Sequence, residues 1–183
     1  MSIFTLIDDL APPALHDAIW QLCWRPRWRF GHQSVADGAG VPFWIMDLGG
    51  EPLVDELWAL ARPRCEAVAG QPLRVYRQYA NGHTYGLGGQ THTDDLRPGT
   101  HTLLYYPMKT WPPVWEGETV FYDPQGALIG VVQPRPNRAL IFDARIPHQG
   151  RPPSRLCGTL RVTVAFKLEP VAGPPAAAGA APG

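Results

Sequence analysis

Charged residues are scarce in this sequence of 183 residues. Lys, Arg, Asp and Glu make up 17% of it, whereas about a quarter is usual. The 16 basic and 16 acidic residues cancel, and no block of like charges occurs. The sequence therefore lacks the basic surface that nucleic acids and anionic membranes attract, and we expect neither as a partner. A hydrophobic share of 45% also excludes a disordered polyelectrolyte.

Cysteines are few, and long hydrophobic runs are absent. Cys23, Cys65 and Cys157 are odd in number and far apart, which favours reduced thiols over a disulfide framework. No stretch approaches 18 uncharged apolar residues, and the N-terminus lacks the pattern of a signal peptide. We therefore predict a cytoplasmic location and no membrane insertion. The sequence carries no signal for an oligomeric state.

Glycine and proline, in contrast, are abundant. The 19 glycines and 21 prolines make up about 22% of the chain where about 12% is usual, which predicts many turns. The length suits one domain with its own core. We predict a single domain over residues 1–169, with helical support in 1–70 and a β core in 71–169. The uncharged segment 170–183 is expected to be a flexible tail.

Hydrophobic periodicity predicts two helices followed by strands. One amphipathic helix should follow Pro12 and Pro13, because apolar residues recur at helical spacing from Leu15 to Cys23. A second should span Pro52 to Ala69, with Gly70 as its C-terminal cap. Segment 24–50 is expected to form short strands and loop. Further strands are expected at 73–79, 100–106, 118–122, 127–132, 138–143 and 160–168. Two helices on the outside of a closed or sandwiched antiparallel sheet is the simplest arrangement.

The last predicted strand alternates most clearly. Leu160, Val162, Val164, Phe166 and Leu168 form one apolar face, and Arg161, Thr163, Ala165 and Lys167 form the other. Arg161 is expected to point into the barrel, where a guanidinium is costly unless it meets an anion. The alternative is an edge strand on which Arg161 and Lys167 are solvated.

A possible metal site lies in the motif His92-Thr-Asp94. On an extended backbone, residues two apart point to the same side, so both side chains can reach one cation. Taken alone, this pattern also fits a hydrogen-bonded His-Asp pair in a turn. His148 follows a second apolar strand. Two histidines and one carboxylate on one face of an octahedral ion leave three positions open, as non-haem Fe(II) oxygenases require.

With these motifs the sequence resembles the Fe(II)/2-oxoglutarate-dependent dioxygenases, in particular their prolyl 4-hydroxylase-like branch. The resemblance covers residues 73–168 and is carried by five segments in the family's order. These are the Tyr-x-x-Gly segment 79–85 with the HxD, the Tyr-Tyr strand 103–106, the Gly-Gly-Glu-x-x-Phe strand 116–121, and the closing pair 138–148 and 161–166. Glu116 replaces the first glycine of its motif, and Pro107-Met108 replaces Leu-Asn. The interval from Tyr79 to His92 is longer than in the compact motif.

The resemblance implies a role for each matching residue. His92, Asp94 and His148 would ligate Fe(II), and Arg161 would bind the C5 carboxylate of 2-oxoglutarate. Tyr106 would assist Arg161, and Tyr79 and Tyr85 would complete the co-substrate site. The implied fold is a double-stranded β-helix, a jelly-roll or cupin-like barrel with the two N-terminal helices on its outside.

The implied activity is hydroxylation of an unactivated C–H bond, coupled to conversion of 2-oxoglutarate and O2 to succinate and CO2. Asp94 favours hydroxylation over halogenation, because related halogenases lack this carboxylate. The expected substrate is a small molecule such as a free amino acid or a natural-product intermediate. Loops at strand ends carry specificity, so the candidate substrate contacts are Gln90, Arg97, Trp111, Trp115, Arg145, Arg151 and Arg155. Their alternatives are solvated arginines and tryptophans that cap the core.

Three other functions remain open at this stage. A peptidyl hydroxylase of the prolyl type would use the same centre on a larger substrate. A cupin-type enzyme would use the metal ligands without 2-oxoglutarate. A catalytically silent binding module would need neither the metal nor Asp94.

Overall fold

The computed structural model describes residues 3–35 and 40–171. Within them the chain forms mainly β-structure with two α-helices and one 3-10 helix. In chain order the elements are β1 (Phe4–Ile7), α1 (Pro13–Leu22), β2 (Arg29–His32), β3 (Phe43–Asp47), α2 (Pro52–Ala69), β4 (Leu73–His83), β5 (His101–Tyr106), η1 (Pro113–Trp115), β6 (Thr119–Tyr122), β7 (Leu128–Val132), β8 (Arg138–Asp143), β9 (His148–Gly150) and β10 (Arg161–Pro170).

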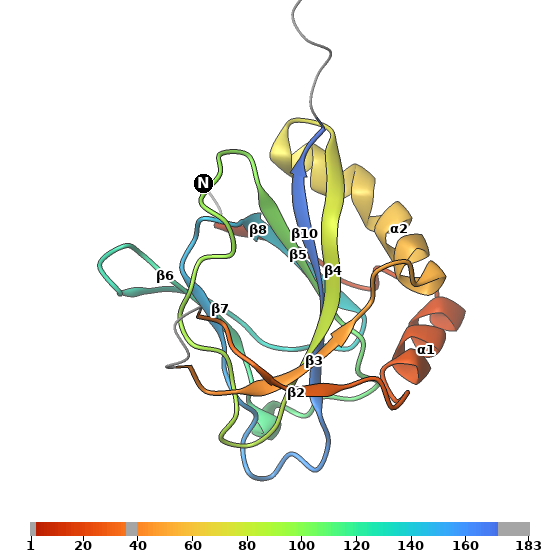
Figure 1. Cartoon of the computed structure of the whole chain (residues 1–183), viewed down its shortest axis with the longest axis vertical. Coiled ribbons are helices and arrows are strands. Elements are labelled where there is room, and N and C mark those ends of the chain that lie inside the picture. Colours follow the sequence, from red (N-terminus) through yellow and green to blue (C-terminus); the bar gives the residue numbers. More distant parts are fainter. Residues whose placement is uncertain (1–2, 36–39, 172–183) are drawn as a thin grey trace, which may run out of the picture.

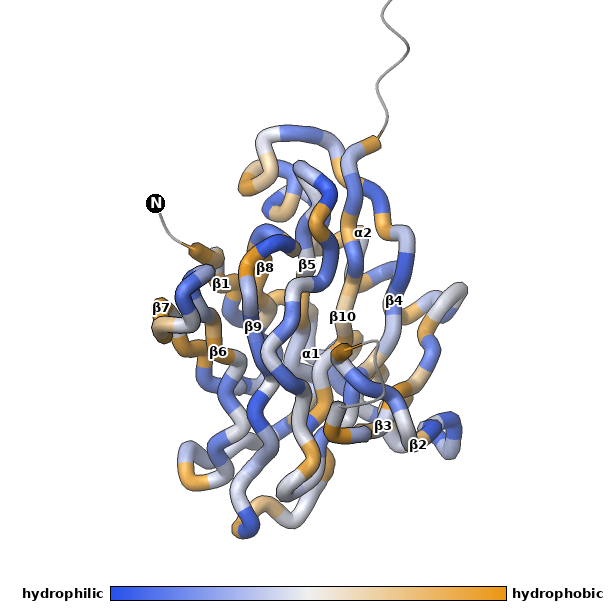
Figure 2. The backbone as a smooth tube through the Cα atoms, turned by 60° about the vertical axis from the view of Figure 1, so that its left-hand side comes forward, coloured by the Kyte–Doolittle hydropathy of each residue, from blue (hydrophilic) through white to orange (hydrophobic). Residues whose placement is uncertain are grey.

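The strands form two antiparallel sheets. The larger has the order β1-β8-β5-β10-β4-β3-β2, and the smaller has the order β7-β6-β9. Figure 1 shows both helices on the side of the large sheet where β4 and β10 lie. In the turned view, the small sheet lies on the opposite side of the molecule from α2 (Figure 2). Strands far apart in sequence thus enclose a space between the sheets, with the helices outside, as predicted.

Each helix buries one stripe of apolar side chains. In α1 the buried residues include Leu15, Ile19 and Leu22, and Pro13 occupies the first turn, where its missing N–H costs no hydrogen bond. In α2 they are Val54, Leu57, Ala61 and Cys65. Gly70 ends α2 with φ 68°, in the left-handed region that glycine adopts without strain. The helices therefore form and end where the sequence predicts.

β10 is a central strand with both faces buried. It pairs with β4 on one side and β5 on the other, so every residue from Arg161 to Leu168 is buried. Only 1% of Arg161 and 6% of Lys167 is exposed. The alternative of a solvated edge strand is therefore wrong. Phe166 faces the helices and lies 6.2 Å from the Trp58 ring, while the polar face points between the sheets.

Several boundaries differ from the sequence prediction. β4 continues to His83, four residues beyond the predicted end, because β10 and β3 supply hydrogen-bond partners on both sides. β1 and β9 were not predicted; they have four and three residues. Pro170, the first residue of the predicted tail, ends β10. Residues 172–183 of that tail lie outside the described part of the chain, and the division of the domain stays a prediction.

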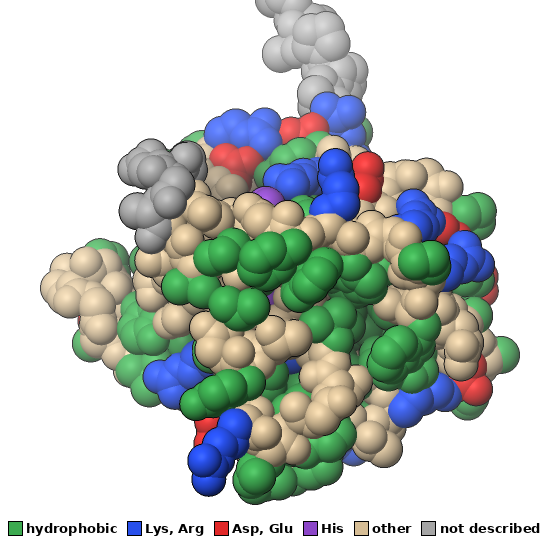
Figure 3. Space-filling view, turned by 60° about the horizontal axis from the view of Figure 1, so that its bottom comes forward, with side chains coloured by type: hydrophobic (Ala, Val, Ile, Leu, Met, Phe, Trp, Pro, Cys, Tyr) green, Lys and Arg blue, Asp and Glu red, His purple; other side chains and the backbone are tan. Residues whose placement is uncertain are grey.

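The lower surface of the molecule is largely uncharged. Hydrophobic side chains occupy the middle of this face, and basic side chains lie mostly toward its margins (Figure 3). Exposed aromatic residues of the described chain include Trp24, Phe30 and Tyr85. Within the described residues, no helix has both the length and the apolar character needed to cross a bilayer.

Candidate metal and co-substrate site

Three ligand atoms from two segments of the chain meet between the sheets. One ligand atom from each of His92, Asp94 and His148 can be chosen so that all lie within 4.8 Å of one another. His92 Nε2 lies 3.2 Å from Asp94 Oδ1, and His148 Nε2 lies 3.5 Å from Asp94 Oδ2. Ligands about 2.1 Å from one ion lie about 3 Å apart when they occupy neighbouring octahedral positions. The group can therefore hold one metal ion.

Backbone hydrogen bonds hold these ligands in place. The His92 amide donates to the His148 carbonyl at 3.0 Å, and the His148 amide donates to the His92 carbonyl at 2.9 Å. The Asp94 amide donates to the Ala144 carbonyl at 2.9 Å. The HxD segment, which lies outside the named strands, is thus fixed against the chain that leads into β9.

Both histidines present the same ring nitrogen to the centre. His92 Nδ1 lies 2.8 Å from the carbonyl oxygen of Gln90, and His148 Nδ1 lies 3.0 Å from that of Ile146. A carbonyl oxygen can only accept, so Nδ1 carries the proton and Nε2 keeps a free lone pair. Such hydrogen bonds orient metal-binding histidines in proteins.

Asp94 is held by two further side chains. Thr102 Oγ1 donates to Asp94 Oδ2 at 2.5 Å, and Lys167 Nζ forms an ion pair with the same oxygen. Burial alone would raise the pKa of Asp94, but Lys167, His148 and His92 hold it well below its ordinary value. Burial lowers the pKa of His148 to about 4, although Asp94 opposes this shift. At neutral pH the ligand set is therefore a carboxylate with a neutral His148.

Lys167 was not predicted to be part of the site. The signal was present, because Lys167 lies on the same face of the final strand as Arg161. Burial acts to lower the pKa of Lys167, but Tyr79 and Asp94 raise it above its ordinary value. Lys167 is thus a buried cation beside a candidate metal ligand.

Arg161 lies at the other end of the site, where Glu118 acts on it electrostatically without an ion pair among the described residues. Its guanidinium donates to the Gly117 carbonyl and, at 3.1 Å, to Thr119 Oγ1. Burial lowers its pKa, and no carboxylate within residues 3–35 and 40–171 forms an ion pair with it. The buried Oδ1 of Asn81, in the same cavity, has no hydrogen-bond partner among the described residues. The buried guanidinium of Arg161 therefore needs an anion as its partner.

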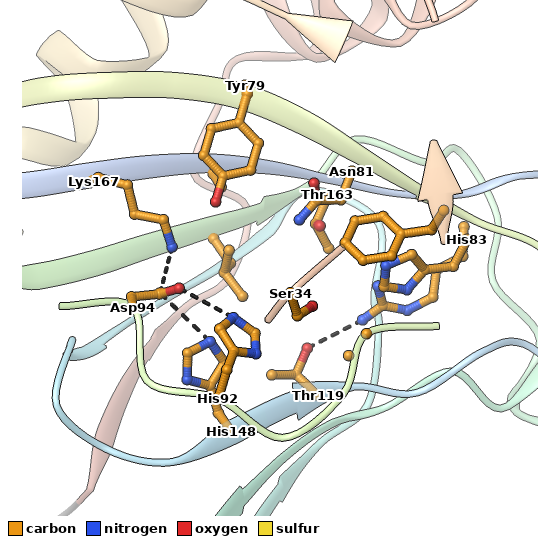
Figure 4. A pocket seen from close by; sticks show the side chains of 16 residues that line it. Ser34, Tyr79, Asn81, His83, His92, Asp94, Thr119, His148, Thr163 and Lys167 are labelled. Atoms are coloured by element: carbon orange, nitrogen blue, oxygen red, sulfur yellow. Dashed lines mark hydrogen bonds and ion pairs between the residues drawn. The ribbon is translucent and has the colours of Figure 1, made fainter. Parts of the chain in front are cut away.

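The two ends of the site share one cavity. On one side of it lie Asp94, His92, His148 and Lys167 (Figure 4). On the other side lies His83, beside the Arg161 guanidinium that donates a hydrogen bond to Thr119. An adjoining cavity of about 280 Å³ shares His92, Asp94 and Lys167 with the first. The arrangement offers a metal position, an anion position and an adjacent space.

The three predicted co-substrate tyrosines lie in different places. Tyr79 lines both cavities. Tyr106 is buried, its hydroxyl lies 2.7 Å from Thr119 Oγ1, and its ring centroid lies 5.7 Å from the Arg161 guanidinium carbon. Tyr85 is 66% exposed and lines a separate shallow hollow with Trp24. The structure thus brings Tyr79 and Tyr106 to the site but not Tyr85.

Most of the predicted substrate contacts lie away from these cavities. Arg145 donates to Asp143 and Arg97 donates to Asp95, in each case through several short hydrogen bonds. Arg151 and Arg155 are exposed, and neither lines the metal cavity. Gln90 reaches the site through its backbone carbonyl, which accepts a hydrogen bond from His92 Nδ1.

The two predicted tryptophans pack beside Glu116 and Gly117, and the Gly117 carbonyl accepts a hydrogen bond from Arg161. Trp111 and Trp115 stack edge to face with centroids 5.2 Å apart, and Trp111 Nε1 donates to the Glu116 carbonyl. Trp111 belongs to the core and Trp115 packs against it. Both rings therefore lie where tryptophans that cap the core would lie, which was the alternative to a substrate contact.

His83 is the last residue of β4 and lies inside the cavity. It is buried, and Arg161 Nη1 lies 3.4 Å from His83 Nδ1. Burial and, to a lesser degree, Arg161 lower its pKa well below the ordinary value. His83 is therefore a neutral wall of the anion position and not a metal ligand.

Comparison with known proteins agrees with this geometry. Residues 77–166 match the family model of the 2OG-Fe(II) oxygenase superfamily. No curated protein sequence matches the chain. This chain carries a 2OG-Fe(II) oxygenase domain.

Solved structures of this superfamily share the fold. A Pseudomonas putida prolyl-4-hydroxylase is 16% identical with a TM-score of 0.68, over 91% of this chain and 92% of that chain. A Trichoplax adhaerens prolyl hydroxylase in complex with a hypoxia inducible factor peptide is 18% identical with a TM-score of 0.65, over 91% and 84%. HygX from Streptomyces hygroscopicus, with nickel, 2-oxoglutarate and hygromycin B bound, is 15% identical with a TM-score of 0.66, over 92% and 83%. At these identities the likeness establishes the double-stranded β-helix fold.

The protein is thus a 2-oxoglutarate-dependent dioxygenase that uses Fe(II), 2-oxoglutarate and O2. Its own residues fit these groups. Two imidazole nitrogens and one carboxylate are the donor set of non-haem Fe(II) oxygenases. The buried Arg161 supplies a countercharge for a dicarboxylate. Glycine at position 117, with φ 80°, lets the Arg161 side chain pack against the backbone there, because a Cβ on Gly117 would lie 2.9 Å from Arg161 Cδ.

Proposed function

We propose that this dioxygenase hydroxylates an unactivated C–H bond of a small molecule, such as a free amino acid or a natural-product intermediate, and releases succinate and CO2. The observation that carries the proposal is the single cavity with the His92, Asp94 and His148 atoms at one end and the buried Arg161 at the other. Bound Fe(II) and 2-oxoglutarate would supply the activation of O2 and its coupling to decarboxylation.

The residues of the chain divide the binding tasks between them. His92, Asp94 and His148 would hold the metal on one face and leave the rest of its coordination sphere open. Arg161 would bind the C5 carboxylate of 2-oxoglutarate. Thr119, which accepts a hydrogen bond from the guanidinium, and the neighbouring Tyr106 would hold that guanidinium in place. Burial of these groups excludes water, which strengthens their electrostatic interactions.

The adjoining cavity supports a small substrate. Its volume of about 280 Å³ lies near the lower end of the range for ligand pockets, about 300 to 1,000 Å³. Its walls include His92 and Asp94, so an occupant would lie beside the metal. Most of its lining side chains are polar, which suits a compound with several hydrogen-bonding groups.

The test combines co-substrate binding with product analysis. Anaerobic addition of Fe(II) and 2-oxoglutarate should give a weak visible charge-transfer band. The Arg161→Met variant should lose this band while still binding metal. The control Arg74→Met removes an exposed arginine that pairs with Glu169 at 2.7 Å, and it should keep the band. Metal binding without a 2-oxoglutarate response in the wild type would favour the cupin-type alternative instead.

Substrate class is tested by turnover. Amino acids, small metabolites and short peptides are screened for stimulated succinate release and a product heavier by one oxygen atom. Stimulation by a small molecule supports the proposal. Stimulation by peptides alone would assign the protein to the peptidyl hydroxylases, and stable binding without any turnover would support the binding-module alternative.

A further inference from the structure

The outer wall of the second cavity contains an irregularity in β4. Lys167 pairs with Arg77 and Leu168 pairs with Val75, so Tyr76 has no partner on β10 and forms a β-bulge. Neighbouring residues of a regular strand point to opposite faces. Here Tyr76 and Arg77 both line the cavity of about 280 Å³. Bulges near active sites commonly redirect a side chain in this way.

Arg77 is a cation that no carboxylate of the described residues neutralises. Its guanidinium carbon lies 4.4 Å from the ring centroid of Tyr79, a contact that steadies the side chain above the cavity. No Asp or Glu of the described chain, residues 3–35 and 40–171, forms an ion pair with it. The side chain is exposed, so a ligand entering the cavity can reach it.

Among the described residues that line this cavity, the charges leave a positive excess. Arg77 lies directly opposite Lys167 in the sheet, and like charges in this position repel. Asp94 is the single carboxylate among the described residues that line the cavity, and its Oδ2 already pairs with Lys167. Burial lowers the pKa of His32 on the same wall, and Arg77, His92 and Lys167 lower it further.

We propose that Arg77 binds a carboxylate of the substrate, and hence that the substrate of this oxygenase is a small carboxylic acid; this inference rests on the proposed function. The planar guanidinium pairs with a carboxylate through two parallel hydrogen bonds. A molecule held there lies in a cavity that His92 and Asp94 also line, so its far end is directed toward the metal. The C5 carboxylate of 2-oxoglutarate would lie at Arg161, so it does not compete for this position.

The test measures binding without turnover. The protein is loaded with Mn(II) and saturating 2-oxoglutarate, and small carboxylic acids, including free amino acids, are titrated beside their carboxamides by calorimetry. The wild type should bind at least one acid about tenfold or more tightly than its amide. Arg77→Gln should abolish this preference, and Arg77→Lys should retain part of it. The matched control Arg74→Gln, three residues earlier in β4, should leave the preference unchanged.

Three results would overturn the inference: equal binding of acids and amides by the wild type, an undiminished preference in Arg77→Gln, or binding only of neutral or phosphorylated compounds. The affinity for 2-oxoglutarate, measured in each variant, separates this inference from the proposed function. If the wild type fails to bind 2-oxoglutarate, the proposed function fails. If the wild type and Arg77→Gln both bind it and neither prefers acids, only the inference about Arg77 fails.

Discussion

His92 and His148 exchange a reciprocal pair of backbone hydrogen bonds, at 3.0 and 2.9 Å, across a single antiparallel bridge. Two candidate metal ligands that are distant in sequence are thus held together by main-chain atoms. Their imidazole rings, whose centroids lie 4.5 Å apart, contribute the ligand atoms but are not needed for the bridge itself. Ligand removal and local unfolding can therefore be separated experimentally.

Substitution of one histidine should abolish metal binding and leave the fold intact. In His148→Ala we expect Mn(II) affinity to fall by about 100-fold or more, because two remaining ligands cannot complete the facial set. Circular dichroism should be unchanged, because the bridge uses the backbone. His101→Ala is the control, since His101 Nδ1 also meets a backbone carbonyl, that of Gly99. Calorimetric Mn(II) affinity in His148→Ala equal to that of the control would refute the assignment.

The apoprotein should lose stability as the pH falls from about 6.5 toward 4. Burial lowers the pKa of His148 to about 4 and that of His83 well below its ordinary value, whereas unfolded histidines titrate near 6.5. In this window the unfolded chain binds more protons, so acid favours unfolding. Each such histidine contributes about 1 kcal/mol per pH unit. The depressed pKa of Asp94 acts only below its ordinary value of 3.8, outside the window.

Urea denaturation at several pH values measures this slope. His83→Gln removes one of the titrating groups without touching a candidate metal ligand, so its slope should be shallower than that of the wild type. Equal free energies of unfolding at pH 6.5 and pH 5 would contradict the prediction.

Removal of Lys167 should make stability depend on metal. In Lys167→Met without metal, Asp94 keeps a buried charge without its cation, and we expect a loss of about 3 kcal/mol. A bound divalent ion would replace that cation, so Mn(II) should raise the melting temperature more in the variant than in the wild type. Lys167→Arg, which keeps the charge, should behave more like the wild type. Thermal unfolding with and without Mn(II) decides the matter, and an unaltered apo stability would count against the pair.

Glu116→Gly should stabilise the protein. Glu116 adopts φ 55° and ψ −139°, a conformation that costs a non-glycine residue about 1 to 3 kcal/mol. Its side chain is exposed, so little contact is lost on truncation. After the larger backbone entropy of glycine in the unfolded state is subtracted, we expect a net gain of about 1 kcal/mol, or a rise of about 3 °C in melting temperature. Calorimetry of Glu116→Ala, which keeps the strain, provides the comparison.

The parts of the fold that the sequence predicted are those with strong local periodicity. Both helices and the long strands around β10 show it, and alternation alone placed Arg161 on the inward face. β1 and β9 were missed because four and three residues are too few to show a period. The length of β4 was missed because pairing with β3 and β10, and not side-chain pattern, extends it.

The site was predictable where the spacing of residues in the sequence sets the direction of a side chain. It was not predictable where an interaction partner sets that direction. The HxD motif and His148 were found because residue types and order specify them. Arg145 and Arg97 were predicted as substrate contacts, but each follows an aspartate by two residues and donates to its carboxylate in the structure. Arg77 was not considered, because its orientation depends on a bulge that no residue pattern announces.

The two buried faces of β10 connect the helices to the chemistry of the site. Arg161 and Lys167 lie on one face, and Phe166, against Trp58 of α2, lies on the other. A shift of this strand by one residue would exchange the faces and remove both cations from the cavity at once. Packing of Phe166 beneath α2 therefore fixes which face of β10 carries Arg161 and Lys167. Variation in that packing is a route by which residues that touch no ligand can change catalysis.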